Sequence, residues 1–432
     1  MQVSKLFKRV LILRFCILNL FVFCLLSFGI SPANAQDSLN SKIVEDSTFH
    51  LYQAKNWNGL IALGNEALDK GFDYYYLRLR LGIAYYEQKN YRAAQIHFRK
   101  ADGFNSADDV LNEYLYYCYI FNAQYDEARK LSRKFSPQLI KKLNLVKQPL
   151  VEYVITEGGI KLPDQKQMSN AFYGVFGLGH RVGKIFSVNH AVTIFNQNQK
   201  PQNFNQKQYY VSANIPVSKS WLVSPAFHFL NRTISFLPPP KPSGNGNGNG
   251  NGNGNNPPPP LVPAPISSSY YVGSLSIRRS ISKFDIGIGG TFSNIDSISQ
   301  TQANLTFGFF PLGNNKLFFT GTGYLQKESV SKEYKYAFSP SLNATPFLKL
   351  NLSVSYLYNQ AHHLNEMNGY IANNSTDLTS SKITFTGNII MSAHVNFYLL
   401  YQLENKTQNN PQNNTVTNYS YNNFFGGFKF IL

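Results

Sequence analysis

The sequence is poor in charged residues and in cysteine. Asp, Glu, Lys and Arg together make up 15% of its 432 residues, whereas an ordinary soluble domain carries roughly 25%. Of the three cysteines, Cys16 and Cys24 fall in a hydrophobic N-terminal segment, which leaves Cys118. A scaffold held together by disulfide bonds is therefore excluded.

Long hydrophobic runs are also missing beyond the N-terminus. No stretch there approaches the roughly 18 consecutive apolar residues that a membrane-spanning helix needs, which argues against a polytopic helical membrane protein. A formal net charge of +17 is compatible with a nucleic-acid partner, but the sequence has no basic cluster or nucleic-acid-binding motif. We therefore expect no nucleic acid among the partners.

Aromatic residues, by contrast, are plentiful. The chain contains 28 Tyr and 34 Phe, and aromatics make up 15% of the sequence, as many as all charged residues together. The mean hydropathy is nevertheless slightly hydrophilic, at -0.25. This combination is unusual for a soluble globular protein, and it needs an architecture that exposes aromatic side chains.

The N-terminus has the pattern of a targeting signal. A basic start is followed by an apolar stretch over residues 15–30, and Ala33 and Ala35 then precede Gln36. Small residues at these two positions form the cleavage pattern of a secretory signal peptide. We predict a signal peptide over residues 1–35 and a secreted mature chain; the alternative is an uncleaved anchor helix.

Residues 41–145 repeat with a helical pattern. Similar residues recur 34 positions apart, as in the pairs Tyr91 and Tyr125, Ala94 and Ala128, Leu81 and Leu115, and Tyr85 and Tyr119. A 34-residue period is that of tetratricopeptide (TPR) repeats. The middle unit resembles that family through Leu81-Gly82, Tyr85, Ala94, Phe98 and Ala101. We predict three units, 41–72, 75–108 and 109–142, in a short all-α solenoid over residues 36–147.

The TPR resemblance also implies a binding surface. Arrays of this family bind extended partners along the concave face formed by the first helix of each pair. Matching the family pattern to this sequence places Tyr76, Tyr86 and Tyr117 near that face, so they are candidate partner-binding residues. The alternative is that these tyrosines pack in the interior, because helical stripes of aromatics usually face a core.

From residue 148 to residue 432 the pattern changes to period two. Leu348, Leu350, Leu352, Val354 and Tyr356, for example, alternate with Lys349, Asn351, Ser353 and Ser355. About fourteen such runs have the roughly ten-residue length with which a tilted strand crosses a bilayer. Since a soluble sandwich also alternates, this pattern alone does not identify the fold.

The connections between these runs identify the fold as a membrane barrel. Short turns near residues 182–183, 217–219, 280–282, 312–315, 344–346 and 392–393 alternate with long polar segments at 196–206, 235–268, 294–300, 327–332, 359–380 and 405–417. Short turns on one side and long loops on the other are typical of an outer-membrane β-barrel. We predict an antiparallel transmembrane β-barrel of about 14 strands over residues 148–432. The helical domain would then lie in the periplasm of a Gram-negative-type bacterium.

The last predicted strand supports this assignment. Phe424, Gly426, Phe428, Phe430 and Leu432 form one apolar face that continues to the final residue. This face resembles the C-terminal assembly signal of outer-membrane barrels. Within the barrel, Pro225 interrupts a predicted strand and is expected to mark a kink.

Residues 235–268 are of low complexity. They consist of proline runs on either side of a stretch of alternating Gly and Asn. Such a composition cannot bury a core, and we predict a disordered extracellular loop. A surface spacer or plug is one interpretation; neutral expansion of a repeat in a permissive loop is the other.

No catalytic or metal-binding pattern stands out. His362, His363 and Glu366 offer ligand atoms, but adjacent histidines do not share a helix face, and we expect a solvated loop there. His190 and His228 lie in predicted strands without a recognisable nucleophile partner. We therefore predict no enzyme activity, no cofactor and no metal.

The predicted barrel interior is polar and weakly basic. Residues 148–432 contain 20 Lys and Arg against 10 Asp and Glu. The candidate lumen residues are Lys316, Lys335, Lys349, Lys382 and Lys429, with Tyr210, Tyr324 and Tyr398; the same register places Tyr173, Glu152, Asp285 and Glu404 inside. Such an interior suits anionic or sugar-containing solutes. The alternative is that these groups pair with one another and fill the barrel.

The order of signal peptide, helical repeats and barrel resembles two known architectures, the exopolysaccharide-export porins and the surface-lipoprotein assembly modulators. Both imply an outer-membrane transport or export barrel whose periplasmic repeat domain docks a partner or a cargo, either polymer or protein. The alternative is a surface anchor or adhesin that acts through its long extracellular loops. A barrel hydrolase is a third possibility.

Overall fold

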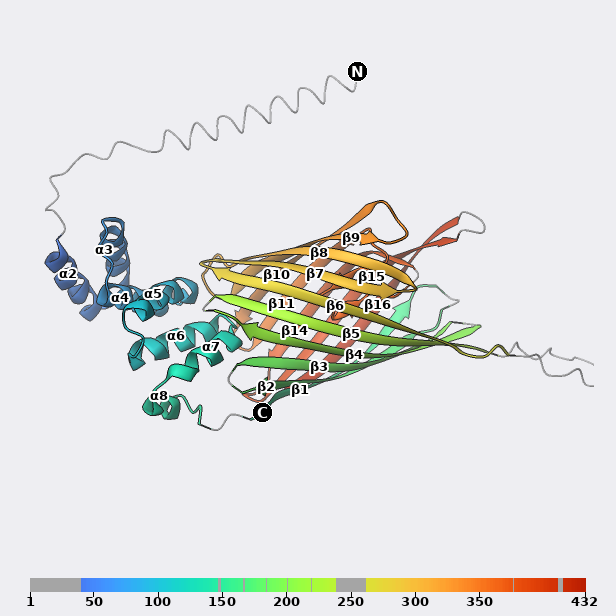
Figure 1. Cartoon of the computed structure of the whole chain (residues 1–432), viewed down its shortest axis with the longest axis horizontal. Coiled ribbons are helices and arrows are strands. Elements are labelled where there is room, and N and C mark those ends of the chain that lie inside the picture. Colours follow the sequence, from blue (N-terminus) through green and yellow to red (C-terminus); the bar gives the residue numbers. More distant parts are fainter. Residues whose placement is uncertain are drawn as a thin grey trace, which may run out of the picture.

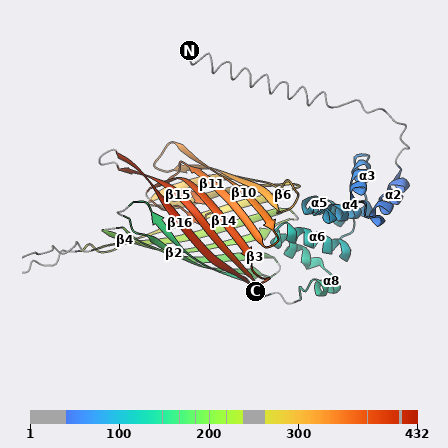
Figure 2. The same ribbon diagram turned by 180° about the vertical axis from the view of Figure 1, so that it is seen from behind.

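The computed structural model describes residues 40–146, 149–165, 168–183, 185–199, 201–218, 220–237, 262–375, 377–410 and 415–432. In them a helical region precedes a closed β-barrel, and the helices gather at one end of the barrel (Figures 1 and 2). The predicted signal peptide at 1–35 lies outside the described residues. So do residues 238–261, which make up most of the predicted low-complexity loop.

The described part of the helical region has seven α-helices and one short 3-10 helix. They are α2 (Ser41–Gln53), α3 (Trp57–Asp69), α4 (Tyr75–Glu87), α5 (Tyr91–Phe104), α6 (Asp109–Phe121), α7 (Tyr125–Leu131), η1 (Ser132–Lys134) and α8 (Pro137–Lys142). Helices α2, α4 and α6 begin at residues 41, 75 and 109, and α3, α5 and α7 begin at 57, 91 and 125. The 34-residue period of the sequence is therefore a period of helix pairs. No described helix has the length and apolar character needed to cross a membrane.

Local sequence explains where these helices begin and how closely they pack. The side chains of Asn56 and Asn90 accept hydrogen bonds from the amides of Gly59 and Ala93 and so cap α3 and α5. In α4, a Cβ atom added to Gly82 would come within 2.4 Å of the fully buried Phe98 ring. The contact between α4 and α5 therefore requires glycine at this position.

Fourteen of the described strands form a closed antiparallel barrel. They are β1 (Val151–Pro163), β2 (Ala171–Val182), β3 (Phe186–Gln199), β4 (Gln202–Pro216), β5 (Trp221–Phe236), β6 (Ile266–Ile281), β7 (Phe284–Ile295), β8 (Ile298–Phe309), β9 (Leu317–Glu328), β10 (Tyr334–Phe347), β11 (Leu350–Asn359), β14 (Leu378–Ile390), β15 (Val395–Asn410) and β16 (Thr415–Ile431). Strand β1 pairs with β16 and closes the barrel. The predicted antiparallel barrel of about 14 strands is confirmed.

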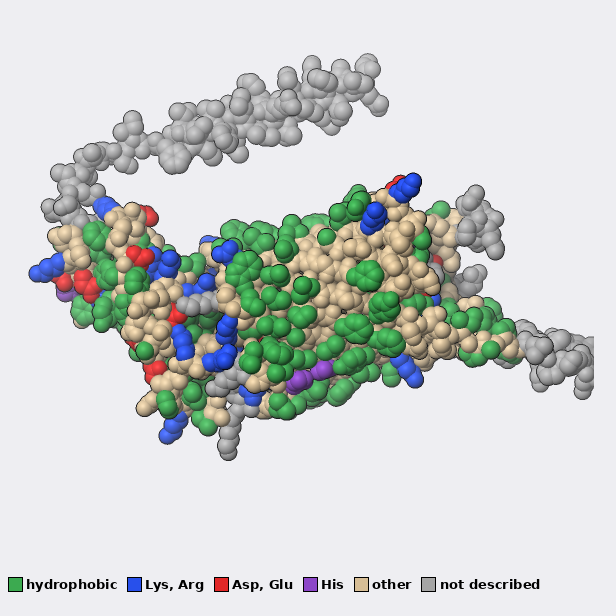
Figure 3. Space-filling view, viewed as in Figure 1, with side chains coloured by type: hydrophobic (Ala, Val, Ile, Leu, Met, Phe, Trp, Pro, Cys, Tyr) green, Lys and Arg blue, Asp and Glu red, His purple; other side chains and the backbone are tan. Residues whose placement is uncertain are grey.

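The two faces of the barrel wall differ as the period-two pattern requires. In β2, Phe172 and Phe176 are exposed on the outside, whereas Ala171 and Val175 are buried inside. Figure 3 shows hydrophobic side chains covering the outer wall and charged side chains near its two ends. A closed barrel satisfies its backbone hydrogen bonds between strands, so its apolar outer wall can face lipid. This is the architecture of an outer-membrane protein.

Strand β5, which contains Pro225, has an interruption in its pairing with β4. Strands β4 and β5 pair at Ser212 and Ala226 and again at Ile215 and Val223, with no recorded pair between these two points. Proline has no backbone N–H to donate, which explains the interruption. The wall is therefore locally irregular at the predicted position.

Candidate functional site

The segment between β11 and β14 folds into the barrel. Strands β12 (Asn365–Glu366) and β13 (Ile371–Ala372) form a short antiparallel hairpin that belongs to no wall strand pair. We call residues 360–375 the plug. Because His363 and Glu366 are only 5% and 8% exposed, the prediction that they lie in a solvated loop was wrong. The physical reason is that the wall offers hydrogen-bonding partners for the polar groups of this segment.

Two inward-facing glutamines of the wall hold the first arm of the plug. Gln302 in β8 donates to the Asn365 carbonyl at 2.7 Å and accepts from the Asn365 amide at 3.1 Å. Gln326 in β9 donates to the His363 carbonyl at 2.7 Å. Next to them, Leu364 packs with the buried side chains of Tyr324 and Leu357. The arm is thus fixed by polar and apolar contacts together.

The turn of the plug reaches strands β5 and β6 of the wall. The Asn368 carbonyl accepts from Ser274 at 2.7 Å, and its side-chain amide donates to the Ser224 carbonyl at 3.0 Å. His228 donates to the Gly369 carbonyl at 2.9 Å. Gly369 has a φ of +79°, which favours glycine. The plug therefore contacts the wall from β5 to β9, and the ion pair of Glu366 with Lys382 in β14, seven strands from β5 in the ring of fourteen, carries it across the lumen.

Buried charges lie beside the plug. Lys382 in β14 forms an ion pair with Glu366 of the plug at 2.6 Å. Glu404 in β15 pairs with Lys161 at 2.8 Å and with Lys406 at 3.4 Å. Three cations thus share two carboxylates in this part of the lumen, which agrees with the basic interior expected from the sequence.

The plug leaves a cavity next to the wall of β1 to β4. Its volume is about 180 Å³, and its lining includes Tyr153, Asn189, Tyr210 and the plug residue Tyr370. The Tyr210 and Tyr370 rings meet edge to face with centroids 5.1 Å apart. The cavity thus lies where the plug ends against the wall.

The helical region covers the short-turn end of the barrel. Arg92 at the start of α5 forms two hydrogen bonds with the Asp285 carboxylate, at 2.8 and 3.2 Å. The Arg92 guanidinium also stacks on the Phe310 ring, 3.3 Å from its centroid, and only 3% of the side chain is exposed. A buried arginine that bonds to a carboxylate along its edge and stacks on an aromatic ring with one face forms a specific interface.

Further polar contacts continue this interface along α7. Arg129 pairs with Glu152 of β1, and Glu127 with Arg278 of β6 at 3.4 Å. Lys130 donates to the carbonyls of Pro216 and Val217, at 2.8 and 2.7 Å. Burial raises the pKa of Glu127, although the charge of Arg278 partly offsets this effect. We call helices α5 to α7 the cap.

The predicted lumen lysines fall into two groups. Lys382 and Lys429 point into the barrel, where Lys429 lies over the Tyr153 ring at 4.0 Å. Lys335 lies near the start of β10, away from the cap, and pairs with Glu333 at 2.9 Å. Lys316 and Lys349 are exposed in turns at the cap end, because β9 and β11 begin one residue later. These two positions lie outside the wall of the lumen.

The predicted tyrosines also lie in different surroundings. Tyr210, Tyr324 and Tyr398 are on inward-facing positions of β4, β9 and β15. In the helical region, the Tyr86 and Tyr117 rings both lie near Phe121, with centroids 6.2 and 6.0 Å from it. Tyr76 is 57% exposed and stands apart from them, beside Arg80.

The remaining histidines make contacts of other kinds. His190 lies on the outer wall, stacked on His180 and within 2.8 Å of the Tyr209 hydroxyl. His228 is bound to the plug, as described above. The described residues contain no group of three or more His, Cys, Asp and Glu side chains placed to hold a metal ion.

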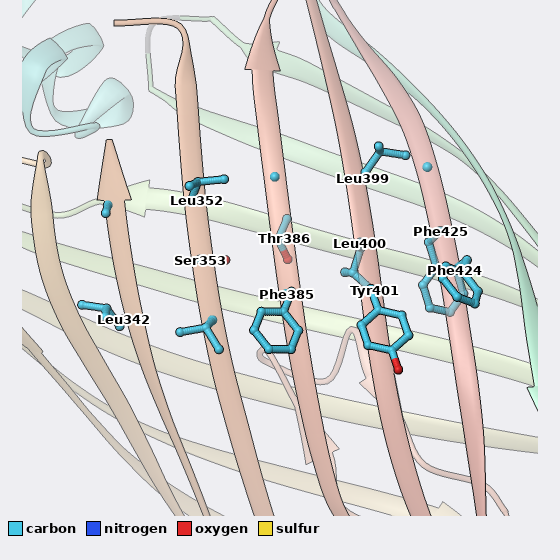
Figure 4. Close-up of a pocket in the computed structure, with 14 residues that line it drawn as sticks. Leu342, Leu352, Ser353, Phe385, Thr386, Leu399, Leu400, Tyr401, Phe424 and Phe425 are labelled. Carbon is cyan, nitrogen blue, oxygen red and sulfur yellow. The ribbon is translucent and has the colours of Figure 1, made fainter. Parts of the chain in front are cut away.

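The outer wall has an apolar groove of its own. Its volume is about 780 Å³, and it crosses β10, β11, β14, β15 and β16. Large side chains such as Leu352, Phe385 and Tyr401 line it (Figure 4), together with the small residues Ala344, Gly387 and Gly426. Since this groove is on the outer face of the wall, it faces lipid rather than the lumen.

Sequence reasoning missed the residues that hold the plug. Gln302 and Gln326 stand at inward positions of β8 and β9 and are paired across the two strands. Two large amides at matching positions of neighbouring strands were a usable signal, because a buried amide needs a partner. The partner itself, Asn365, lies in a segment that reads as an ordinary polar loop.

No protein-family model matches the chain, and no curated protein matches it either. Among solved structures, the chain is similar to the P. putida toluene transporter TodX, with 8% identity, a TM-score of 0.42, and coverage of 70% of this chain and 94% of TodX. It is also similar to the Ralstonia pickettii toluene transporter TbuX, with 8% identity, a TM-score of 0.41, and coverage of 66% and 90%. A Pseudomonas aeruginosa FadL homologue matches with 6% identity, a TM-score of 0.39, and coverage of 65% and 90%. These values describe a similarity between barrels and no more.

Proposed function

We propose that this protein is a gated transport barrel of the outer membrane, closed in the present conformation by its plug and covered by its cap. The observation that carries the proposal is the plug, which crosses a polar lumen on hydrogen bonds and one ion pair. The interior of an eight-stranded barrel is filled by side chains, whereas barrels of 16 to 18 strands leave a water-filled channel. Fourteen strands enclose space beyond their own side chains, and here a loop occupies it.

The way the plug is held supports a gate rather than a permanent filling. Its wall contacts are mainly side chains bonded to plug carbonyls and amides, as at Gln302, Gln326 and His228. Each such bond contributes only about 1 kcal/mol net, because water replaces it when the plug moves. The plug can therefore leave the lumen without unfolding the barrel.

We propose further that the short-turn end faces the periplasm and that the helical region is a TPR-type docking domain for a periplasmic partner or cargo. The 34-residue helix pairs and the exposed Tyr76 support this proposal. The cap would then bring that partner or cargo directly to the mouth of the barrel. Deletion of residues 41–145 should leave a folded barrel that no longer supports export, whereas unchanged export would rule out the docking role.

Conductance in planar lipid bilayers tests the gate. We expect the full chain to show little or flickering current, and a variant with residues 361–375 replaced by a short Gly-Ser linker to show a stable open current. Heat-modifiable migration in gels confirms that each variant is a folded barrel. A folded, plug-replaced barrel without conductance would show that the protein is an anchor and not a channel.

A further inference from the structure

Glu157 is an inward-facing carboxylate that differs from its counterparts in having no cation beside it. It stands in the middle of β1 and is partly buried. The three carboxylates that the sequence analysis placed in the lumen each have a basic partner: Glu152 pairs with Arg129, Asp285 with Arg92, and Glu404 with Lys161. Within the described ranges, no Lys or Arg forms an ion pair with Glu157. A partly buried charge without a counter-ion is costly, so this position is suited to a cation from outside the chain.

A glycine in the neighbouring strand lets a tyrosine reach this carboxylate. Glu157 of β1, Gly427 of β16 and Tyr398 of β15 are paired in one row across the wall. A Cβ atom at Gly427 would come within 2.7 Å of the Tyr398 hydroxyl, so the tyrosine side chain crosses the strand at this glycine. Its hydroxyl thereby lies against the Glu157 carboxylate.

The next row of the wall adds two more rings. Tyr173 of β2 and Phe425 of β16 both pair with Gly159 of β1, and their rings meet edge to face with centroids 5.3 Å apart. A Cβ atom at Gly159 would come within 2.1 Å of the Phe425 ring, so the wall has no room for a side chain there. The Tyr173 hydroxyl also lies against Glu157. Rings from three strands thus gather around one carboxylate.

The plug adds a fourth ring and leaves space beside it. Tyr370 of the plug lies against Tyr173, and its hydroxyl is close to the charge of Glu157. The cavity of about 180 Å³ reaches this place, because its lining includes Tyr370 and Val175, the residue that pairs with Glu157. An engineered cavity of about 150 Å³ accommodates benzene, and a trimethylammonium group has fewer non-hydrogen atoms than benzene. The space between wall and plug therefore has room for such a group.

Lys429 is the nearest lysine in the strand register, since it pairs with Ile155, two residues before Glu157. Its ammonium group is turned the other way and lies 4.0 Å from the centroid of the Tyr153 ring. Glu152, and not Glu157, is the carboxylate whose charge acts on it. Lys429 therefore leaves Glu157 without a counter-ion, and it shows that an ammonium group can lie on a tyrosine ring in this lumen.

We propose that Glu157 and the rings of Tyr173, Tyr398, Phe425 and Tyr370 form a binding site for a small organic ammonium ion with methyl groups on its nitrogen. The carboxylate supplies the opposite charge. Aromatic rings attract ammonium ions through the negative charge on their faces, and a methylated ion is weakly hydrated and suits such rings better than a metal ion does. That the ion is a solute of the barrel rests on the transport function proposed above, whereas its binding does not.

Calorimetry with the full chain in dodecyl maltoside tests the site. The probes are choline and its uncharged isostere 3,3-dimethylbutan-1-ol, in which a carbon atom replaces the charged nitrogen. We expect choline to bind at least tenfold more tightly than the alcohol, and equal affinities would overturn the proposal. Potassium chloride at the same concentration as choline should not displace it. Displacement would assign the site to simple cations and would also overturn the proposal.

Matched variants separate the charge from the rings, and heat-modifiable migration confirms that each is a folded barrel. Glu157→Gln should reduce the preference for choline over the alcohol to less than threefold. Glu333→Gln removes an exposed carboxylate of the same barrel and should leave the preference unchanged. Phe425→Leu should weaken choline binding at least tenfold. Lys429→Gln should change it less than threefold, because a larger rise would identify Lys429 as the counter-ion of Glu157 and overturn the site.

Calorimetry and conductance distinguish the two proposals. Choline binding that Glu157→Gln abolishes, together with a folded, plug-replaced barrel that does not conduct, would support the ammonium site and remove the transport function. Stable conductance of the plug-replaced barrel, together with a full chain that does not prefer choline, would overturn the ammonium site and leave the transport function standing.

Discussion

The side chain of Gln302 pairs with the backbone of Asn365 as a neighbouring strand would. Its amide nitrogen donates to the Asn365 carbonyl at 2.7 Å, and its amide oxygen accepts from the Asn365 amide at 3.1 Å. Both residues are almost fully buried. The side chain of one wall residue thus satisfies both the backbone N–H and the backbone carbonyl of Asn365.

Gln302→Leu should open the barrel. The substitution leaves the Asn365 amide and carbonyl unpaired while the plug stays in place, which costs about 2 kcal/mol, or roughly thirtyfold in the ratio of open to closed barrels. Single-channel recordings measure the open probability. Thr306→Val is the matched control, because Thr306 is on the same strand but contacts Thr322 instead of the plug. Equal open probabilities for the two variants would contradict this assignment.

Asp285→Asn should release the cap. Arg92 is 3% exposed, and loss of its carboxylate partner leaves a buried charge unpaired, at a cost of about 3 kcal/mol. We expect faster hydrogen exchange in α5 and the neighbouring helices of the cap. Glu333→Gln removes an exposed ion pair at the opposite end of the barrel and should leave the exchange unchanged. Undisturbed exchange in the Asp285 variant would show that the cap is held elsewhere.

The helical region should lose stability as the pH falls below 6.5. Burial, together with the charge of Arg78, lowers the pKa of His97 to about 4, and Arg78 donates to its Nδ1 atom at 3.2 Å. Between pH 6.5 and 4 the unfolded chain binds a proton that the folded chain does not, so acid favours unfolding. At pH 5 the loss relative to pH 7 is about 2 kcal/mol.

Thermal unfolding of the helical circular dichroism signal at pH 7 and pH 5 measures this effect. His97→Phe retains a ring that can stack on Tyr85 and removes the titrating group. The variant should therefore show a smaller difference between the two pH values. An identical difference in the variant and the parent protein would assign the acid sensitivity to other groups.

Replacing either of two glycines of the helix pairs with alanine should change the stability of the helical region, in opposite directions for the two. Gly82→Ala places a methyl group within 2.4 Å of the buried Phe98 ring and should destabilise the helical region by about 1–3 kcal/mol. Gly103, in α5, has nothing within 4 Å of its added Cβ atom, so Gly103→Ala should stabilise the region by about 0.5 kcal/mol. Denaturant unfolding compares them, and a shift of the same sign in both would contradict the packing described for α4.

The alternation of apolar and polar residues predicted the wall strands, because each strand shows this pattern within its own sequence. Phe172 and Phe176 face lipid while Ala171 and Val175 face inward, and this alternation is readable two residues at a time. The helix pairs could also be predicted, since equivalent residues such as Leu81 and Leu115 recur at a fixed interval. In both cases each element carries its own pattern.

The plug could not be predicted from such a local pattern. Asn365 is buried because Gln302, 63 positions earlier in the chain, meets it across the lumen, and no local pattern encodes such a meeting. Lys316 and Lys349 show a second limit. Alternation alone extends each strand too far, whereas Lys316 and Lys349 are the last residues of the turns that precede β9 and β11.

The two mouths of the barrel are closed by different parts of the chain. The plug is bound mainly by strands β4 to β9, whereas β1 and β16 meet at the seam. These plug contacts can form on a sheet that is still open, before its first and last strands join. The plug enters from the end away from the cap, because β11 begins at the cap end and the plug follows its last residue, Asn359. The plug and the cap therefore close opposite mouths of one pore, and either can seat or leave without the other.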